Sequence, residues 1–285
     1  MYQILRKQKL NENVTLMDIE APLVANKGKA GQFIILRVDE EGERIPLTIA
    51  GTNPKEGSVT IIFQIVGLTT YKLNLKNEKE FIHDFVGPLG NPTDLDNIDE
   101  LALVAGGVGV AIALPILKEA KGRGIKVHSI IGFRNKDLVI LEDDFKSLSD
   151  SFVLTTDDGS MGIKGNVTMP LDTLLKENDN VSKVITIGPL IMMKYVALKG
   201  KEYQKEVTVS MNPIMIDGTG MCGGCRLSLI KDGKKIMKFA CADGPDFNGL
   251  EVDFDETMKR NKMYQEIEKK KYDAFCNLMN KKVNE

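Results

Sequence analysis

Short apolar runs separated by turn signals dominate the first third of the chain. Residues 31–38, 45–51 and 58–67 are rich in β-branched and apolar side chains, and the turn-forming stretch TNPKEG separates the second run from the third. Closely spaced strands of this kind predict a small antiparallel β-barrel. The Gly- and Pro-rich stretch DFVGPLGNP interrupts the pattern, so we predict a first domain at 1–95.

From about residue 99, buried strands alternate with helices. Strands are predicted at 100–107, 126–133, 151–160 and 183–189, and helices at 110–124, 137–148 and 190–200. This alternation predicts βαβ units around a parallel sheet, in a second domain at 96–210. The stretch 101–117 has no charged residue, but its glycines and Pro115 favour a strand, a turn and a packed helix over a membrane span.

A cysteine-bearing segment at 211–250 and a polar extension at 251–285 complete the chain. Apolar side chains in the extension recur at roughly helical spacing and predict an amphipathic helix; they are Tyr264, Ile267, Tyr272, Phe275 and Met279. The pattern leaves open whether this helix packs on its own chain or docks a partner subunit. The predicted fold class is therefore α+β and multidomain: an antiparallel barrel, a parallel α/β domain, a cysteine loop and a helical tail.

The composition is that of a soluble globular protein, with 42% hydrophobic and 27% charged residues among 285. A formal net charge of -2 gives no basic surface for nucleic acid or for a membrane. The N-terminus becomes polar before an apolar signal region can form, which predicts a cytoplasmic location. In such a chain, four cysteines predict metal binding rather than disulfides.

The stretch DGTGMCGGC contains the strongest chemical signal. Its two cysteines have the spacing C-x2-C, and a third cysteine follows sixteen residues later. Zinc would need a fourth Cys or His, and His83 and His128 lie in other segments. The spacing D-x4-C-x2-C matches the plant-type ferredoxin pattern, with aspartate replacing the first cysteine. We therefore predict a [2Fe–2S] cluster, with a zinc site or a purely structural loop as alternatives; the predicted ligands are Asp217, Cys222, Cys225 and Cys241.

Glycines and acidic residues follow three of the predicted parallel strands. The run AGGVGVA lies where a strand meets a helix, and backbone amides at a helix N-terminus can hold a pyrophosphate. Aspartates at another strand end would bond a ribose diol and repel a 2′-phosphate, which favours NAD over NADP; alternatively, they only cap a turn. The predicted dinucleotide-binding residues are Gly106, Gly107, Gly109, Asp157, Asp158, Gly188 and Pro189.

Two stretches of the predicted barrel carry polar groups suited to a phosphorylated cofactor. Arg44 can pair with a phosphate, although by itself it also fits a solvated surface charge, and Thr48 offers a hydroxyl to a ring nitrogen. In VGLTTYKL, Gly67, Thr69 and Thr70 form a loop and a helix start whose amides and hydroxyls can serve a second phosphate.

Together, RIPLT, GPLG, AGGVG, GP-x-x-MM and the cysteine loop resemble the ferredoxin–NADP+ reductase superfamily over essentially the whole chain. Within it, the chain is most similar to the electron-transfer subunit of dihydroorotate dehydrogenase and to the small subunit of electron-bifurcating NADH-dependent reduced ferredoxin:NADP+ oxidoreductase, also described as sulfide dehydrogenase. The aspartate before Cys222 and the long tail resemble the second group more.

This resemblance implies FAD in the barrel, NAD(H) on the α/β domain and a [2Fe–2S] cluster in the cysteine loop. Pro46 and Leu47 stand where the superfamily often has a tyrosine that stacks on the flavin, so something else must cover the ring. Thr48 would meet the flavin edge. The FAD-binding residues implied are Arg44, Pro46, Leu47, Thr48, Gln64, Val66, Gly67, Thr69 and Thr70.

The implied activity is that of an NAD(P)H-dependent flavin oxidoreductase subunit. It would exchange hydride with NAD(H) and pass single electrons to a larger iron–sulfur flavoprotein in a heterodimer or higher assembly. Ferredoxin and NADP(H) would then be reached indirectly. A dihydroorotate dehydrogenase catalytic subunit is an alternative partner, and a zinc-stabilised nucleotide-binding sensor is an alternative of a different class.

Overall fold

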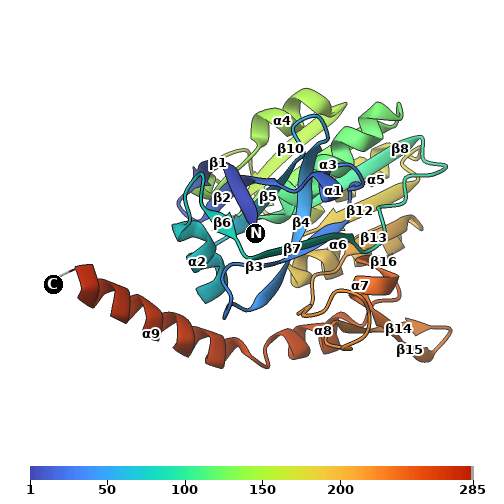
Figure 1. The fold of residues 1–285 in the computed structure, drawn as a ribbon. Coiled ribbons are helices and arrows are strands. Elements are labelled where there is room, and N and C mark those ends of the chain that lie inside the picture. Colours follow the sequence, from blue (N-terminus) through green and yellow to red (C-terminus); the bar gives the residue numbers. More distant parts are fainter. Residues whose placement is uncertain (284–285) are drawn as a thin grey trace.

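The first part of the chain folds into an antiparallel sheet that curves into a near-closed barrel (Figure 1). The strand order is β6-β1-β2-β5-β4-β3-β7, so the predicted antiparallel barrel is confirmed. The structure is a computed structural model that describes residues 1–283, without the side chains of Gln265 and residues 276–283. The strands are β1 (Tyr2–Asn11), β2 (Val14–Glu20), β3 (Phe33–Arg37), β4 (Arg44–Asn53), β5 (Ser58–Gln64), β6 (Phe81–Ile82) and β7 (Asp84–Leu89). Two helices accompany them, α1 (Pro22–Ala25) and α2 (Leu68–Leu75).

Strand β3 is buried on both faces, which explains its unbroken apolar sequence. Ile34 and Leu36 belong to the core inside the barrel. Phe33 and Ile35 point the other way and belong to an apolar cluster that also contains Cys225. The outer face of β3 is therefore covered by the cysteine-bearing segment.

The second sheet has the strand order β11-β10-β9-β8-β12-β13-β16 and is parallel except for β16. The predicted alternation of strands and helices is confirmed. Chain order reverses between β8 and β12, and ligands of open α/β sheets bind at such a switch point. The strands are β8 (Glu100–Gly106), β9 (Lys126–Phe133), β10 (Ser151–Thr156), β11 (Ile163–Lys164), β12 (Lys183–Ile187), β13 (Glu206–Ser210) and β16 (Asp246–Asn248). The helices between them are α3 (Gly109–Gly122), η1 (Lys136–Leu138), α4 (Glu142–Leu148), α5 (Thr168–Glu177) and α6 (Leu190–Glu202).

The uncharged stretch 101–117 divides into strand β8 and the first half of helix α3, as predicted. Residues 101–105 are fully buried in the sheet, and most apolar side chains of α3 are buried against it. In the part of the chain that the structure describes, no helix is long and apolar enough to cross a membrane.

The cysteine-bearing segment leaves the second sheet after β13 and returns to it as β16. Between them lie a loop, the hairpin β14 (Arg226–Lys231) and β15 (Lys234–Phe239), and the short helix α7 (Ala240–Asp243). The link between barrel and parallel sheet is bonded to this segment: the amide of Asn91 donates to the carbonyl of Gly244 at 2.7 Å, and the hydroxyl of Thr93 donates to Asp246 at 2.6 Å. Barrel, parallel sheet and cysteine segment therefore meet at one junction.

The C-terminal extension forms two helices rather than the single one that the periodicity predicts. Helix α8 (Phe254–Asn261) begins with an N-cap, in which the Asp253 carboxylate accepts a hydrogen bond from the amide of Glu256. Helix α9 (Gln265–Val283) then runs along the outside of the molecule to α2 (Figure 1). The predicted apolar residue Met279 lies outside the side chains that the structure describes.

A polar cluster lies at the opposite end of the parallel sheet from the glycine-rich turns. The Glu100 carboxylate accepts hydrogen bonds from Asn178 at 2.8 Å and from Lys126 at 3.1 Å, and lies 3.1 Å from Nε2 of His128. The pKa of Glu100 is lowered to about 2, chiefly by the hydrogen bond from Asn178. Burial acts in the opposite direction and raises this pKa, but its effect is smaller. The ionised carboxylate is thus preferred in the folded state.

Replacing Glu100 by glutamine should lower the free energy of unfolding by about 1–3 kcal/mol at pH 7, because a charged hydrogen-bond acceptor is lost. Since folding lowers this pKa, the stabilisation is present above the ordinary value of 4.5 and is lost as the pH falls towards 2. Urea unfolding between pH 7 and pH 3 measures it. Glu12→Gln, at an exposed ion pair with Lys9, is the control and should change little. If the difference in unfolding free energy between wild type and Glu100→Gln stayed the same at pH 3, the lowered pKa of Glu100 would be contradicted.

Candidate functional site

The cysteine loop holds two of its three cysteines in contact with each other. Cys225 and Cys241 are buried with their Sγ atoms 3.1 Å apart, whereas Cys222 is exposed. Gly218, Gly220 and Gly223 have φ angles of 84°, 88° and 65°, a backbone conformation that favours glycine. The glycines therefore allow the loop to turn back on itself around the thiols.

Backbone amides of the loop point at the sulfur atoms. The amide of Gly224 donates to Sγ of Cys222 at 3.4 Å and is the largest cause of a lowered pKa of this thiol. The amide of Cys241 donates to Sγ of Cys225 at 3.5 Å. Burial, followed by the neighbouring Cys225 thiol, raises the pKa of Cys241 to about 12. The loop thus presents two buried, adjacent thiols and one accessible, more acidic thiol.

Asp217 lies in the same loop, but its carboxylate turns back onto the chain. It accepts hydrogen bonds from the amide of Thr219 at 3.0 Å, from the Thr219 hydroxyl and from the amide of Met221 at 3.4 Å. The Thr219 hydroxyl is the largest cause of a lowered pKa of Asp217, and the charge of Arg44 adds to it. Within the described residues, no three His, Cys, Asp or Glu side chains form a ready metal site. Ligation by Asp217 therefore stays a prediction.

The donors nevertheless fit an iron–sulfur cluster better than zinc. Iron–sulfur clusters are held by thiolates and are tuned by hydrogen bonds to sulfur, and both are present here. A fourth ligand from histidine is not at hand, because His128 bonds Ser151 and Glu100, and His83 lies beside Asp84 on the barrel. The chemistry of the donor set supports the cluster.

The cysteine loop packs directly on the barrel. A Cβ atom added to Gly218 would lie 2.8 Å from the side chains of both Ile35 and Leu89. Ile35 pairs with Pro46 across strands β3 and β4. The thiols are therefore held next to the strand that carries the predicted flavin residues.

The predicted residues of β4 do not all face the same way. Arg44 is exposed and Thr48 half-buried, and with Pro46 they occupy alternate positions on one face of the strand. Leu47 instead packs against the apolar core inside the barrel. Only the backbone of Leu47 can therefore meet a cofactor on the outer face. Gln64 ends the neighbouring strand β5, and the side chain of Val66 is 76% exposed just beyond it.

In the turn before α2, one of the hydroxyls predicted to bind a phosphate is already hydrogen-bonded to the backbone of the turn. Oγ of Thr70 accepts hydrogen bonds from the amides of Val66 at 3.0 Å and Gly67 at 3.1 Å, and donates to the Gly67 carbonyl at 3.0 Å. The first-turn amides of α2 are left as donors, beside the buried Thr69. Phosphate binding here would thus come from the helix N-terminus more than from Thr70.

The glycine-rich turns after β8 and β12 meet at the switch point. A Cβ atom on Gly109 would lie 2.4 Å from the carbonyl oxygen of Ile187, and one on Gly106 would lie 2.4 Å from Sδ of Met192. Gly107 and Gly188 have φ angles of 56° and 156°. Pro189 immediately precedes α6. The seven predicted dinucleotide residues therefore lie at one edge of the sheet, five of them in these two turns.

The two aspartates after β10 have different roles. The Asp158 carboxylate accepts hydrogen bonds from the amide of Ser160 at 2.9 Å and from its hydroxyl at 2.7 Å, which lowers the pKa of Asp158. The Asp158 carboxylate therefore caps its own turn, and a role of Asp158 in dinucleotide binding stays a prediction. Among the described residues none bonds to the carboxylate of Asp157, which is exposed. Arg134, which was not predicted as a site residue, is an exposed cation directly after the neighbouring strand β9; its position at the end of a predicted strand could have indicated it.

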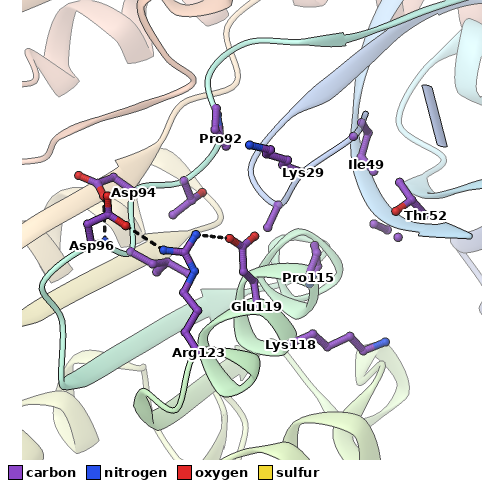
Figure 2. A pocket seen from close by; sticks show the side chains of 16 residues that line it. Lys29, Ile49, Thr52, Pro92, Asp94, Asp96, Pro115, Lys118, Glu119 and Arg123 are labelled. Atoms are coloured by element: carbon purple, nitrogen blue, oxygen red, sulfur yellow. Dashed lines mark hydrogen bonds and ion pairs between the residues drawn. The ribbon is translucent and has the colours of Figure 1, made fainter. Parts of the chain in front are cut away.

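A cavity of about 660 Å³ lies elsewhere, between β4, the linker at 92–96 and the C-terminal half of α3 (Figure 2). Arg123 lies at its side, and its guanidinium donates to Asp96 at 2.9 Å and bonds Glu119. None of the predicted cofactor residues lines this cavity. It is therefore separate from the candidate site.

Comparisons with known proteins agree with this arrangement. The iron–sulfur cluster binding domain of dihydroorotate dehydrogenase B matches residues 212–253. The electron transfer subunit homolog of dihydroorotate dehydrogenase B (NAD(+)) from Thermotoga maritima is 46% identical over 273 residues, which is 96% of this chain and 95% of the relative. The electron transfer subunit from Streptococcus pneumoniae (strain R6) is 35% identical over 224 residues, 77% of this chain and 85% of that subunit.

A solved structure of the NADH-dependent reduced ferredoxin-NADP oxidoreductase, described as giving insights into flavin-based electron bifurcation, is similar over 97% of this chain and 98% of its own. The TM-score is 0.90 and the sequence identity 45%. Similarity of this degree covers barrel, parallel sheet and cysteine segment together. The chain belongs to the family of dihydroorotate dehydrogenase B electron transfer subunits and their homologs, within the ferredoxin–NADP+ reductase superfamily.

Proposed function

We propose that this chain exchanges hydride with NAD(H) at FAD and passes single electrons through a [2Fe–2S] cluster to a larger iron–sulfur flavoprotein subunit. The observation that carries this proposal is the packing of the cysteine loop on the barrel. Gly218 touches Ile35, whose cross-strand partner Pro46 belongs to the strand of the predicted flavin residues. Two redox groups held on adjacent elements can exchange electrons without a mobile carrier.

FAD, when bound, supplies the conversion between a two-electron hydride and single electrons. The residues of this chain bind and orient. Arg44 and the first-turn amides of α2 offer donors to phosphates, and Thr48 offers a hydroxyl to the flavin edge. Hydride transfer requires no protein acid or base, so the contribution of the chain is to hold the nicotinamide against the flavin.

The edge formed by β8 and β12 is proposed to hold NAD(H). Its close-packed glycines let the backbone approach a pyrophosphate at the N-terminus of α3. The free carboxylate of Asp157 would accept a hydrogen bond from a ribose hydroxyl and repel a 2′-phosphate, in favour of NAD(H) over NADP(H). We further propose functional domains at 1–95, 96–210, 211–250 and 251–285, and a cytoplasmic location.

The proposed partner is a larger flavoprotein of the electron-bifurcating type, through which ferredoxin and NADP(H) are reached. The solved structure at 45% identity, that of the bifurcating oxidoreductase, supports this choice over a dihydroorotate dehydrogenase catalytic subunit; the relative at 46% identity is named a homolog of the dihydroorotate dehydrogenase B electron transfer subunit. They also align with more of this chain than the 35% relative, which is named a subunit of dihydroorotate dehydrogenase B.

An anaerobic visible spectrum of the purified protein, recorded before and after addition of NADH, tests the proposal. We expect flavin bands with a broad iron–sulfur shoulder, both bleached by NADH and less readily by NADPH. A flavin spectrum that ignored NADH but responded to NADPH would contradict the assignment of Asp157. A protein that stayed colourless after reconstitution with FAD, iron and sulfide would contradict the proposal as a whole.

A further inference from the structure

Helix α9 lies across α2 through an aromatic cluster. The ring of Tyr71, in the first turn of α2, meets the rings of Tyr272 and Phe275 edge to face, with centroids 5.7 Å and 6.1 Å apart. The ammonium group of Lys72 lies 5.8 Å from the centre of the Phe275 ring. We call Tyr71, Tyr272 and Phe275 the aromatic cluster. It joins the C-terminal extension to the barrel.

The aromatic cluster is next to both groups proposed to bind the FAD phosphates. On one side, Tyr71 lies one helical turn after Gly67, where the first-turn amides of α2 begin. On the other side, Lys271 of α9 forms an ion pair at 3.1 Å with Glu43, the residue before Arg44. If the pyrophosphate of FAD binds between Arg44 and Gly67, the adenosine attached to it would therefore extend from the phosphates past the aromatic cluster.

The chemistry of the aromatic cluster suits an adenine. An edge-to-face contact covers one face of only one ring of a pair, and Lys72 lies over one face of Phe275. Purine bases stack on the faces of aromatic rings whatever their hydrogen-bonding pattern. All three rings are half-buried, so a part of each remains accessible. The flavin end would lie the other way, along β4 towards Thr48 and the parallel sheet.

We propose that the aromatic cluster is the seat of the adenine of FAD, and that helix α9 is therefore part of the flavin site. This inference rests on the proposed FAD site and adds a binding role for the tail. It also separates FAD from FMN, because FMN has no adenosine to place there. The sequence pattern had left open whether the tail packs on its own chain or docks a partner; here it packs on its own chain and serves a ligand.

Flavin binding to the full-length protein, stripped of flavin and titrated with FAD or FMN, tests the inference through quenching of flavin fluorescence. For Tyr272→Ala/Phe275→Ala we expect the Kd for FAD to rise about 10- to 100-fold, the effect of losing aromatic stacking with a base. The Kd for FMN should not change. Phe275→Tyr, which keeps an aromatic ring, should retain the wild-type Kd for FAD.

Tyr264→Ala is the matched control, because Tyr264 is a half-exposed tyrosine just before the same helix and has no contact with α2 in the described structure. It should leave both dissociation constants unchanged. The inference is wrong if wild type binds FAD and the double variant binds it equally well, or if FAD and FMN weaken together. If wild type binds neither flavin, the proposed function itself fails.

Discussion

Replacing Cys225 by serine is expected to remove the iron–sulfur absorbance completely while NADH still bleaches the flavin. Cys225 is 1% exposed, and its Sγ atom lies 3.1 Å from that of Cys241, at the centre of the donor set. A serine hydroxyl is a poor substitute for a thiolate, and its burial prevents solvent from taking its place. Electron transfer from NADH to an external one-electron acceptor should fall by at least about tenfold, whereas the rate of flavin bleaching should not change. Anaerobic stopped-flow spectra separate these two steps.

Two further substitutions control this experiment. Cys276→Ser changes the cysteine that lies outside the loop and should leave the cluster spectrum unaltered. Asp217→Cys should keep a cluster with a shifted spectrum and potential, if the carboxylate of Asp217 is a ligand. A spectrum of Asp217→Cys identical to that of wild type would contradict this ligation without affecting the result for Cys225. Loss of flavin bleaching in Cys225→Ser would contradict the independence of the two cofactor sites.

The features that could be predicted from sequence are those set by local rules. The glycines at 106–109 mark a strand-to-helix turn: a Cβ atom on Gly109 would meet the end of strand β12, and Gly107 has a positive φ that favours glycine. The glycine run that meets these requirements is visible in the sequence. The C-x2-C spacing is similarly local. The antiparallel barrel and the parallel sheet follow from strand length, turn residues and the alternation with helices.

The features that could not be predicted depend on contacts between distant residues or on the direction of one hydroxyl. The Thr70 hydroxyl is hydrogen-bonded to the backbone of its own turn, and the Asp158 carboxylate accepts a hydrogen bond from Ser160. Two of the predicted ligand groups therefore already have hydrogen-bond partners within the chain. Leu47 faces the core because of the pleat register of β4, which the motif does not reveal. The contact of α9 with Tyr71 joins residues about 200 positions apart, and no periodic pattern contains it.

Replacing Gly109 by alanine is expected to lower the free energy of unfolding by about 2–4 kcal/mol and to weaken NADH binding. The new Cβ would lie 2.4 Å from the carbonyl oxygen of Ile187 and 2.9 Å from Cα of Gly188. Both neighbours are backbone atoms at the end of the buried strand β12, so no side-chain rotation can relieve the contact. The turn after β8 and the turn after β12 would have to separate, and these turns form the proposed dinucleotide site.

Gly122→Ala, at the other end of the same helix α3, is the matched control. Nothing lies within 4 Å of its added Cβ, and alanine favours the helix, so stability should stay equal or rise by up to about 1 kcal/mol. Urea unfolding midpoints measure the stability difference, and titration with NADH measures the change in Kd. Equal stability of the two variants would mean that β12 can move away from α3. The steric contact at residue 109 and the binding of a dinucleotide involve the same backbone. We therefore expect Gly109→Ala to lose both stability and affinity for NADH, and Gly122→Ala to lose neither.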